Sequence, residues 1–128
     1  MVEKILNTET RQFKVAFPST LNDNHTLFGG IAMQWMDEVA YITARRFAQQ
    51  KMVTVSVDKI KFLQPINSGS IVEVVGRVSK VKNAIIEIQT NVYIEEMLVK
   101  KNAIEAVFTF AAVNNLNKPV RIFIEKEY

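Results

Sequence analysis

One long stretch without proline, residues 29–50, governs the architecture, and it reads GGIAMQWMDEVAYITARRFAQQ. It has no glycine after Gly30, and good helix formers such as alanine, methionine, glutamine and arginine dominate it. We therefore predict one long helix. Its apolar residues go most of the way round: Ile31, Met33, Trp35, Met36, Val39, Ala40, Ile42, Ala44, Phe47 and Ala48. The helix is expected to be enclosed on nearly all sides, because a flat sheet would cover only one face.

Strand-like segments flank this helix. Before it, residues 11–18 alternate, and Phe13, Val15 and Phe17 form the apolar side that is expected to face a core. After it, four segments rich in valine, isoleucine and phenylalanine are predicted strands: 52–62, 71–81, 84–94 and 103–113. In the first of these, the apolar positions change register near Asp58 and Lys59, which predicts a β-bulge.

Polar and turn-forming stretches separate these elements. Residues 19–26 (STLNDNHT) predict a loop, residues 82–83 a turn, and residues 95–102 a charged link. The end of the chain, residues 114–128, has no predicted place. Together the elements predict an α+β fold in which a curled antiparallel meander wraps one long central helix. A second copy, paired edge to edge and helix to helix, would cover the free edge strand and the rest of the helix.

Composition narrows the class of protein. The 128 residues, 48% of them hydrophobic, suit one domain over residues 1–128. Without cysteine, and with His25 as the only histidine, no thiolate nucleophile or histidine–cysteine metal site is expected. The net charge of +3 is scattered, which argues against nucleic-acid binding. The start does not resemble a signal peptide and no apolar run reaches about 18 residues, so a cytoplasmic protein that does not span a membrane is expected.

The chemically informative stretch is residues 22–38, NDNHTLFGGIAMQWMDE. Gly29 and Gly30 stand where the helix begins, so its first N–H groups are free and no Cβ shields them from a carbonyl oxygen. Taken alone, the glycines are explained better by a tight turn or close packing.

Asp37 stands on a mostly apolar face of the predicted helix. Its helical neighbours are Met33, Ala40, Tyr41 and Ala44. A partly desolvated carboxylate is a candidate general base or nucleophile, because burial raises its basicity. A core aspartate that caps a backbone group is the equally weighted alternative.

Four sequence blocks occur in a characteristic order. They are Asn22-x-x-His25-x-Leu27-Phe28-Gly29-Gly30, Trp35-Met36-Asp37-Glu38, Val55-Ser56-Val57-Asp58-x-Ile60-x-Phe62-x-x-Pro65-Ile66, and Glu105-Ala106-Val107-Phe108-Thr109-Phe110. In this order they resemble the hotdog-fold acyl-CoA thioesterases of the bacterial YciA and mammalian brain acyl-CoA hydrolase type. The resemblance runs from about residue 17 to about residue 119.

The resemblance implies hydrolysis of acyl-CoA to a free acid and coenzyme A, by a homodimer that assembles as three dimers in a hexamer. No cofactor is implied, since coenzyme A is part of the substrate and product. The catalytic aspartate of the family falls on Asp37, and its partner across the dimer falls on Asn22. The N–H that polarises the thioester carbonyl falls on Gly29, and such a donor contributes roughly 3 kcal/mol.

Further substrate contacts are expected around these residues and at the turn between the second and third strands after the helix. The candidates are His25, Phe28, Gly30, Met33, Tyr41, Ser56, Asp58, Lys82 and Asn83. Many family members have Gly-Arg/Lys-Ser/Thr at this turn, whereas this chain has Lys82-Asn83-Ala84, so recognition of phosphate or pantetheine is expected to differ. Lys80, Lys82, Lys100 and Lys101 are candidate phosphate contacts, with a solvated surface as the default alternative.

Two other functions compete with hydrolysis. A hotdog hydratase or dehydratase would use a catalytic histidine, and His25 lies in the predicted loop. A non-catalytic acyl-CoA sensor would bind the ligand without a working base. The presence of both Asn22 and Asp37 argues for the thioesterase.

Overall fold

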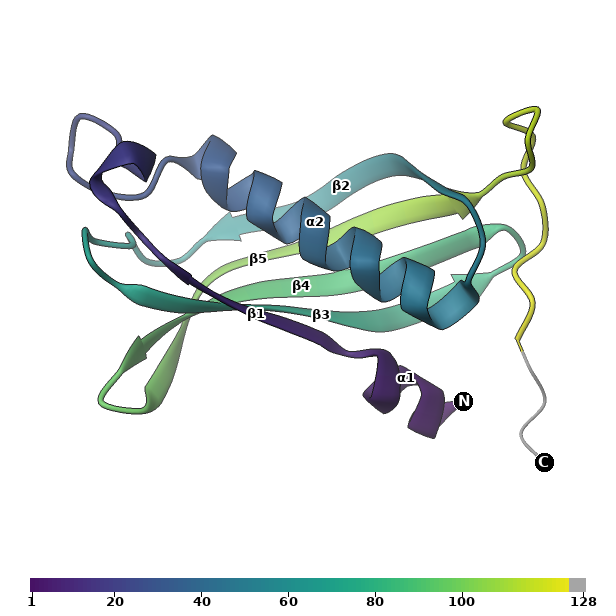
Figure 1. The fold of residues 1–128 in the computed structure, drawn as a ribbon, viewed down its shortest axis with the longest axis horizontal. Coiled ribbons are helices and arrows are strands. Elements are labelled where there is room, and N and C mark those ends of the chain that lie inside the picture. Colours follow the sequence, from purple (N-terminus) through teal and green to yellow (C-terminus); the bar gives the residue numbers. More distant parts are fainter. Residues whose placement is uncertain (125–128) are drawn as a thin grey trace.

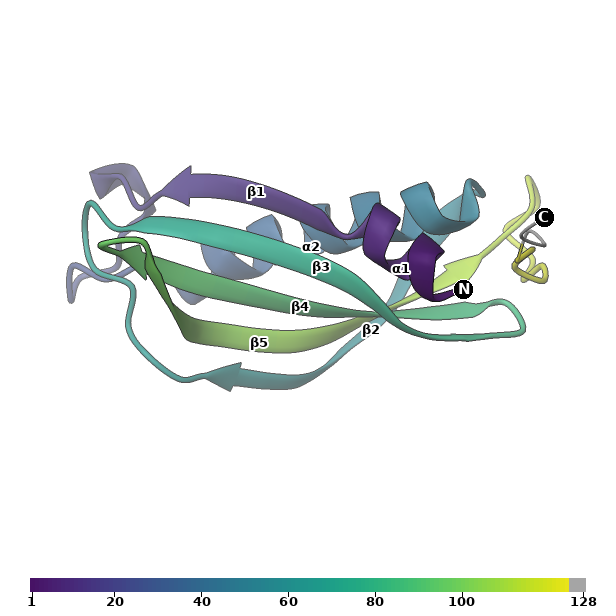
Figure 2. The same ribbon diagram turned by 90° about the horizontal axis from the view of Figure 1, so that it is seen from below.

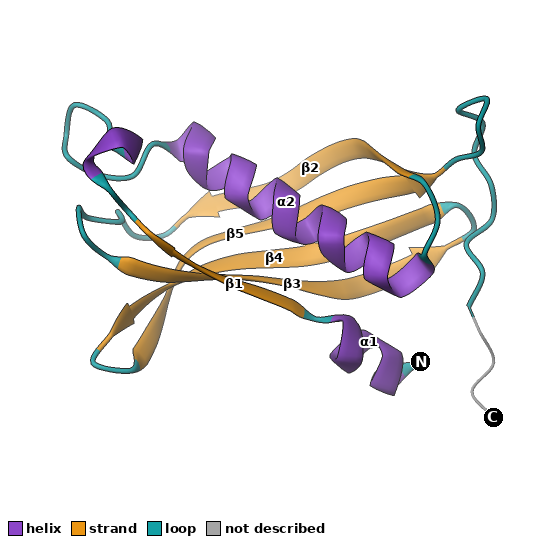
Figure 3. Cartoon of the chain, viewed as in Figure 1, coloured by secondary structure: helices purple, strands orange, loops and turns teal. Residues whose placement is uncertain are grey.

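A long helix lies across one face of a five-stranded antiparallel sheet in the computed structural model, which describes residues 1–124 (Figures 1 and 3). The elements are α1 (Val2–Thr8), β1 (Thr10–Val15), the 3-10 helix η1 (Pro18–Thr20), α2 (Gly29–Ala48), β2 (Met52–Phe62), β3 (Ile71–Lys82), β4 (Ile85–Glu96) and β5 (Val99–Ala112). The predicted α+β arrangement, with its long helix and its later strands, is confirmed. No helix in residues 1–124 has both the length and the apolar content of a membrane span.

The strand order is β1-β3-β4-β5-β2, and every neighbouring pair is antiparallel. The predicted meander is confirmed for β3, β4 and β5, but β2 pairs with β5 and not with β3. Two-residue turns fix the meander, because Asn83, Met97 and Leu98 adopt the positive φ that tight hairpins need. The longer connection 63–70 instead crosses the sheet from β2 to β3, which lies beside β1. β1 and β2 therefore form the two margins of the sheet (Figure 2).

The link between β4 and β5 is shorter than predicted. Only Met97 and Leu98 connect the strands, whereas the charged stretch 95–102 was expected to be a link. Charged residues at the strand ends pair with each other across the hairpin instead, as the Lys101 ammonium does with the Glu96 carboxylate at 3.4 Å. Charged residues therefore do not end a strand while its backbone hydrogen bonds to the neighbouring strand continue.

The predicted bulge in β2 is confirmed. The register between β2 and β5 shifts between Thr54 and Ser56 and again between Asp58 and Lys61, and Lys59 has a φ of 53°. Bulges bend an edge strand and re-aim its side chains.

The prediction for β1 is wrong about which side faces inward. Phe13 is 58% exposed, whereas Thr10 and Ala16, on the opposite side of the strand, are buried. The reason lies in α2, where Arg46 donates to the Thr10 hydroxyl at 3.2 Å and to the Asn7 carbonyl at 2.7 Å, so the polar side of β1 faces the helix. Alternation sets the period of a strand, but the neighbouring element decides which side is buried.

One face of α2 forms the core with the sheet. Its buried residues are Ala32, Met36, Val39, Ala40, Thr43, Ala44 and Phe47. The expected enclosure on nearly all sides is not achieved by one chain, since Ile31, Met33 and Trp35 are only partly buried. The helix approaches β3 closely at Gly76, where an added Cβ would lie 2.6 Å from the Thr43 hydroxyl oxygen.

Two terminal segments had no predicted structure. The helix α1 is held by Arg46, which donates to the carbonyls of Asn7 and Thr8 at its end and of Glu9 just after it. Near the other end, Ile122 is buried and its N–H donates to the Asn83 carbonyl at 2.9 Å. Residues 125–128 lie outside the described part of the chain.

Candidate active site

The loop before α2 is organised by the side chain of Asn22. Its Oδ1 accepts from the N–H groups of Asn24 at 2.9 Å and Thr26 at 3.1 Å, and its Nδ2 donates to the Thr26 hydroxyl at 3.0 Å. Such side-chain bonds replace a regular ladder in a turn. Inside this turn, His25 is exposed and has a φ of 59°.

The start of α2 leaves its first N–H groups available. Phe28 is the N-cap, and its side chain makes no capping hydrogen bond. Its carbonyl accepts from Ile31 and Ala32, both at 3.0 Å, so the N–H groups of Gly29 and Gly30 precede the first intrahelical bonds. They are the two donors that the sequence singled out, and their contact with a carbonyl oxygen stays a prediction.

A cavity of about 350 Å³ opens beside this helix start. Its lining residues are Asn22, Thr26, Leu27, Gly29, Phe62, Leu63, Gln64, Pro65, Ile66 and Ile104. The ring of Phe62 closes one side, 3.5 Å from the position that a Cβ of Gly29 would take. One protomer therefore brings Asn22 and Gly29 together.

Asp37 is not part of this cavity in the same protomer. It follows Gly29 by eight residues, which corresponds to about 12 Å along a helix axis. Its side chain is exposed, and no hydrogen bond or ion pair reaches it from the rest of residues 1–124, so the alternative of a core aspartate capping the backbone is excluded. Partial burial, and secondarily the negative charge of Glu38, raise the pKa of the Asp37 carboxyl.

Tyr41 lies one turn beyond Asp37 and is fixed in place. Its ring packs edge-on against Phe110 at 6.1 Å, and its hydroxyl accepts from Arg45 at 3.0 Å. Phe110 pairs directly with Thr54 of β2, so the two side chains share one face of the sheet, the face toward α2. Thr54 and Asp37 therefore lie on the same side of one protomer, although Thr54 was not among the site residues predicted from the sequence.

The other predicted contacts lie in separate places. Phe28 is exposed and Met33 half-buried near the helix start. Ser56 donates to Asp58 Oδ2 at 3.0 Å in the bulged part of β2. Lys82 and Asn83 line a cavity of about 180 Å³ at the turn between β3 and β4.

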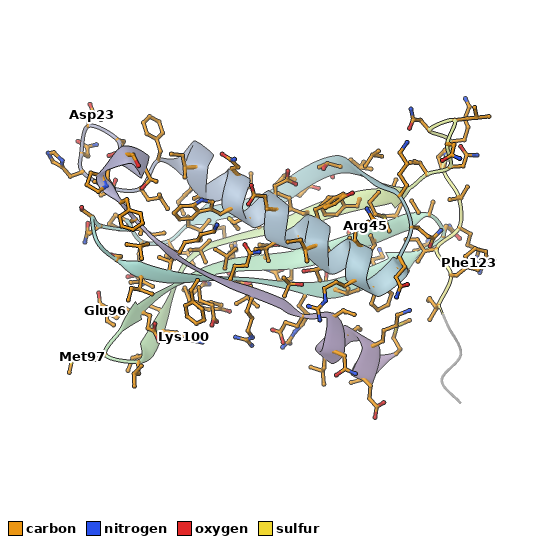
Figure 4. The ribbon with its side chains drawn as sticks, viewed as in Figure 1. Asp23, Arg45, Glu96, Met97, Lys100 and Phe123 are labelled. Atoms are coloured by element: carbon orange, nitrogen blue, oxygen red, sulfur yellow. The ribbon has the colours of Figure 1, made fainter. Side chains whose placement is uncertain are left out.

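The candidate phosphate contacts fall into two groups. Lys100 contacts the Glu73 carboxylate at 2.9 Å and Lys101 contacts Glu96, on the hairpin that Figure 4 shows apart from the Asp23 loop. Lys80 and Lys82 form no ion pair with another residue of the described chain, and both line the small cavity at the β3–β4 turn. The second group is the more available for an anion.

Comparison with protein families assigns the fold. The model of the family described as Thioesterase superfamily matches residues 24–101, which is more than half of the chain and includes the helix start and Asp37. The chain belongs to the thioesterase superfamily. The hotdog architecture expected from the sequence resemblance is confirmed by this match and by the structural neighbours of this thioesterase-superfamily chain.

Three relatives of this thioesterase-superfamily chain are informative. An uncharacterized acyl-CoA thioester hydrolase of Haemophilus influenzae is 36% identical over 106 residues, which are 79% of this chain and 69% of that protein. An acyl-CoA hydrolase of Staphylococcus aureus, solved with butyryl coenzyme A, coenzyme A and coenzyme A disulfide, is 30% identical with a TM-score of 0.89, covering 96% of this chain and 78% of that one. A hexameric thioesterase of Yersinia pestis is 35% identical with a TM-score of 0.81, covering 88% and 93%.

Further structures of the Staphylococcus aureus enzyme carry single substitutions by alanine. The replaced residues are an asparagine, an aspartate and a threonine at positions 28, 43 and 60 of that enzyme. The separations are therefore 15 residues (43 − 28) and 17 residues (60 − 43).

Proposed function

We propose that this member of the thioesterase superfamily hydrolyses acyl-CoA thioesters to a carboxylic acid and coenzyme A. The observation that carries the proposal is a spacing. Asn22, Asp37 and Thr54 are separated by 15 (37 − 22) and 17 (54 − 37) residues, the same separations as the three residues replaced in the Staphylococcus aureus acyl-CoA hydrolase. The shared fold, with a TM-score of 0.89 over 96% of this chain, supports equating the three positions.

In the proposed reaction, Asp37 acts in its ionised form. As a base it takes a proton from water while the oxygen of that water bonds to the thioester carbon, and the bond to the coenzyme A sulfur then breaks. As a nucleophile, its carboxylate oxygen would instead bond to the thioester carbon while the carbon–sulfur bond breaks and coenzyme A leaves, and water would then open the resulting anhydride. In both routes the Gly29 N–H donates to the carbonyl oxygen as negative charge develops there.

We assign the site to two protomers. The cavity that holds Asn22 and Gly29 excludes Asp37 of the same chain, and the face of α2 that carries Asp37 is left uncovered by its own sheet. In a homodimer, Asp37 and Thr54 of one protomer would meet Asn22 and Gly29 of the other. The proposed assembly is a hexamer of three such dimers, and the hexameric thioesterase of Yersinia pestis supports it.

The test of the function is release of free thiol from acyl-CoA esters of several chain lengths. We expect turnover that EDTA does not reduce, because no group of three or more potential metal-ligand side chains occurs in residues 1–124 and none was expected from the sequence. Binding of acyl-CoA without thiol release would favour the sensor. Hydration of an enoyl-CoA without thiol release would favour the hydratase.

The pH dependence of this activity is expected to report Asp37. Because partial burial raises its pKa, kcat/KM should fall as pH decreases through a value above the ordinary 3.8 of an aspartate. In Glu38→Gln the second cause of the shift is removed, so the acid limb should move to lower pH. Both proteins are measured with one substrate, so that ionisation of its phosphates affects both equally. An acid limb that stays in place in Glu38→Gln would show that another group titrates.

A further inference from the structure

We propose that the cavity beside Gly29 receives the acyl chain of the substrate and that Phe62 sets the chain length it accepts. This inference rests on the proposed function and names its substrate class as short- to medium-chain acyl groups. The cavity of about 350 Å³ is near the lower end of the roughly 300–1,000 Å³ that ligand pockets span.

The lining of this cavity suits a hydrocarbon chain. It contains no charged side chain, whereas each of the other cavities described in residues 1–124 has lysine, arginine, aspartate or glutamate in its lining. Three of its apolar residues, Leu27, Ile66 and Ile104, are buried and form its floor. An apolar floor of this kind favours hydrocarbon over any group that must keep its hydrogen bonds to water.

Two of the three polar side chains that line the cavity, those of Asn22 and Thr26, have hydrogen-bond partners within the protein, and the third, that of Gln64, is exposed. Asn22 and Thr26 bond to each other and to the backbone of their own loop. The pantetheine arm of coenzyme A contains two amides, which would need partners that this floor does not offer. The acyl side of the thioester therefore fits the cavity better than the pantetheine side does.

Phe62 stands where it limits the length of the chain. It ends β2 beside the start of α2, as Figure 1 shows, with its ring 3.5 Å from the position of a Gly29 Cβ. A thioester carbonyl held by the Gly29 N–H would place the first acyl carbons against this ring. Phe62 is nevertheless 59% exposed, so removing its ring enlarges the cavity with little loss of core packing.

The experiment compares Phe62→Ala with a matched control, Phe13→Ala. Phe13 has nearly the same exposure, 58%, but lies on β1 at the opposite edge of the sheet and does not line the cavity. In Phe62→Ala, the ratio of kcat/KM for dodecanoyl-CoA to that for butanoyl-CoA should rise about tenfold or more, since one methylene in a fitted pocket changes specificity by roughly 10- to 200-fold. The ratio should stay at the wild-type value in Phe13→Ala.

A second measurement uses S-butyl-CoA and S-dodecyl-CoA, thioethers that bind but are not cleaved. In Phe62→Ala, the affinity for S-dodecyl-CoA measured by calorimetry should rise relative to the affinity for S-butyl-CoA. Equal changes for both chain lengths, no change, or the same shift in Phe13→Ala would overturn the inference. Binding of the thioethers by a wild-type protein that releases no thiol would reject the proposed hydrolysis alone, and the affinity shift would then decide the role of Phe62. Absence of thioether binding would reject both.

Discussion

Replacement of Asp37 by asparagine is expected to lower kcat by about 10²- to 10⁴-fold, the range of a general base. Asparagine has nearly the same shape but neither ionises nor accepts the proton. The fold and the oligomer should persist, because no hydrogen bond or ion pair within residues 1–124 depends on the Asp37 carboxylate. Steady-state kinetics measures the loss of kcat, and thermal unfolding of the same preparation measures whether the fold persists. Glu38→Gln, at the neighbouring exposed position, serves as the control and should keep most of the wild-type kcat at neutral pH.

Mixing of two variants then tests whether the site is shared. Asn22→Asp is the suitable partner, because it keeps the oxygen that accepts from Asn24 and Thr26 and removes the Nδ2 donor. Each variant alone should be nearly inactive. Random reassembly with Asp37→Asn makes about half of the dimers mixed, and one site in each mixed dimer has both natural residues, so roughly a quarter of all sites should recover. Activity that stays at the level of the separate variants after verified subunit exchange would refute the shared site.

Replacement of Gly76 by alanine is expected to destabilise the fold by about 1–3 kcal/mol, the usual cost of overpacking a core. The new Cβ would lie 2.6 Å from the Thr43 hydroxyl oxygen and 3.1 Å from Val39 Cγ1. Thr43 is held in place because its hydroxyl donates to the Val39 carbonyl at 2.7 Å. Relief therefore requires α2 to move away from β3. The midpoint of urea unfolding measures the loss.

A double-mutant cycle identifies the contact responsible for this loss. Thr43→Ala removes the hydroxyl that Gly76→Ala would meet, so the double variant should be more stable than the sum of the two single effects predicts. Gly30→Ala is the control, since its added Cβ meets nothing within 4 Å and alanine favours a helix over glycine. Additive effects of Gly76→Ala and Thr43→Ala would show that the two positions do not collide.

The limits along the chain of the long helix and the bulge in β2 could be predicted from the sequence because their signals are local. The absence of proline from residues 29–50 and the run of helix formers predict α2, and the register change near Asp58 predicts the bulge. Turn residues likewise predict the hairpin at Asn83, whose positive φ the structure has. The candidates Asn22, Gly29 and Asp37 came from the same kind of signal, together with the family resemblance.

Tertiary packing decided what no local pattern encodes. β2 lies at an edge because it pairs with β5 while its connection runs across the sheet to β3, and Phe13 points outward because Arg46 draws the other side of β1 toward α2. Gly76 is required only because a helix distant in sequence passes over it. The cavity at Gly29 is bounded by Phe62, which ends another element and lies against the start of α2. Each of these features depends on the distance between segments far apart in the chain, and that distance is set by the packing of side chains across the core and not by the residues next to one another in sequence.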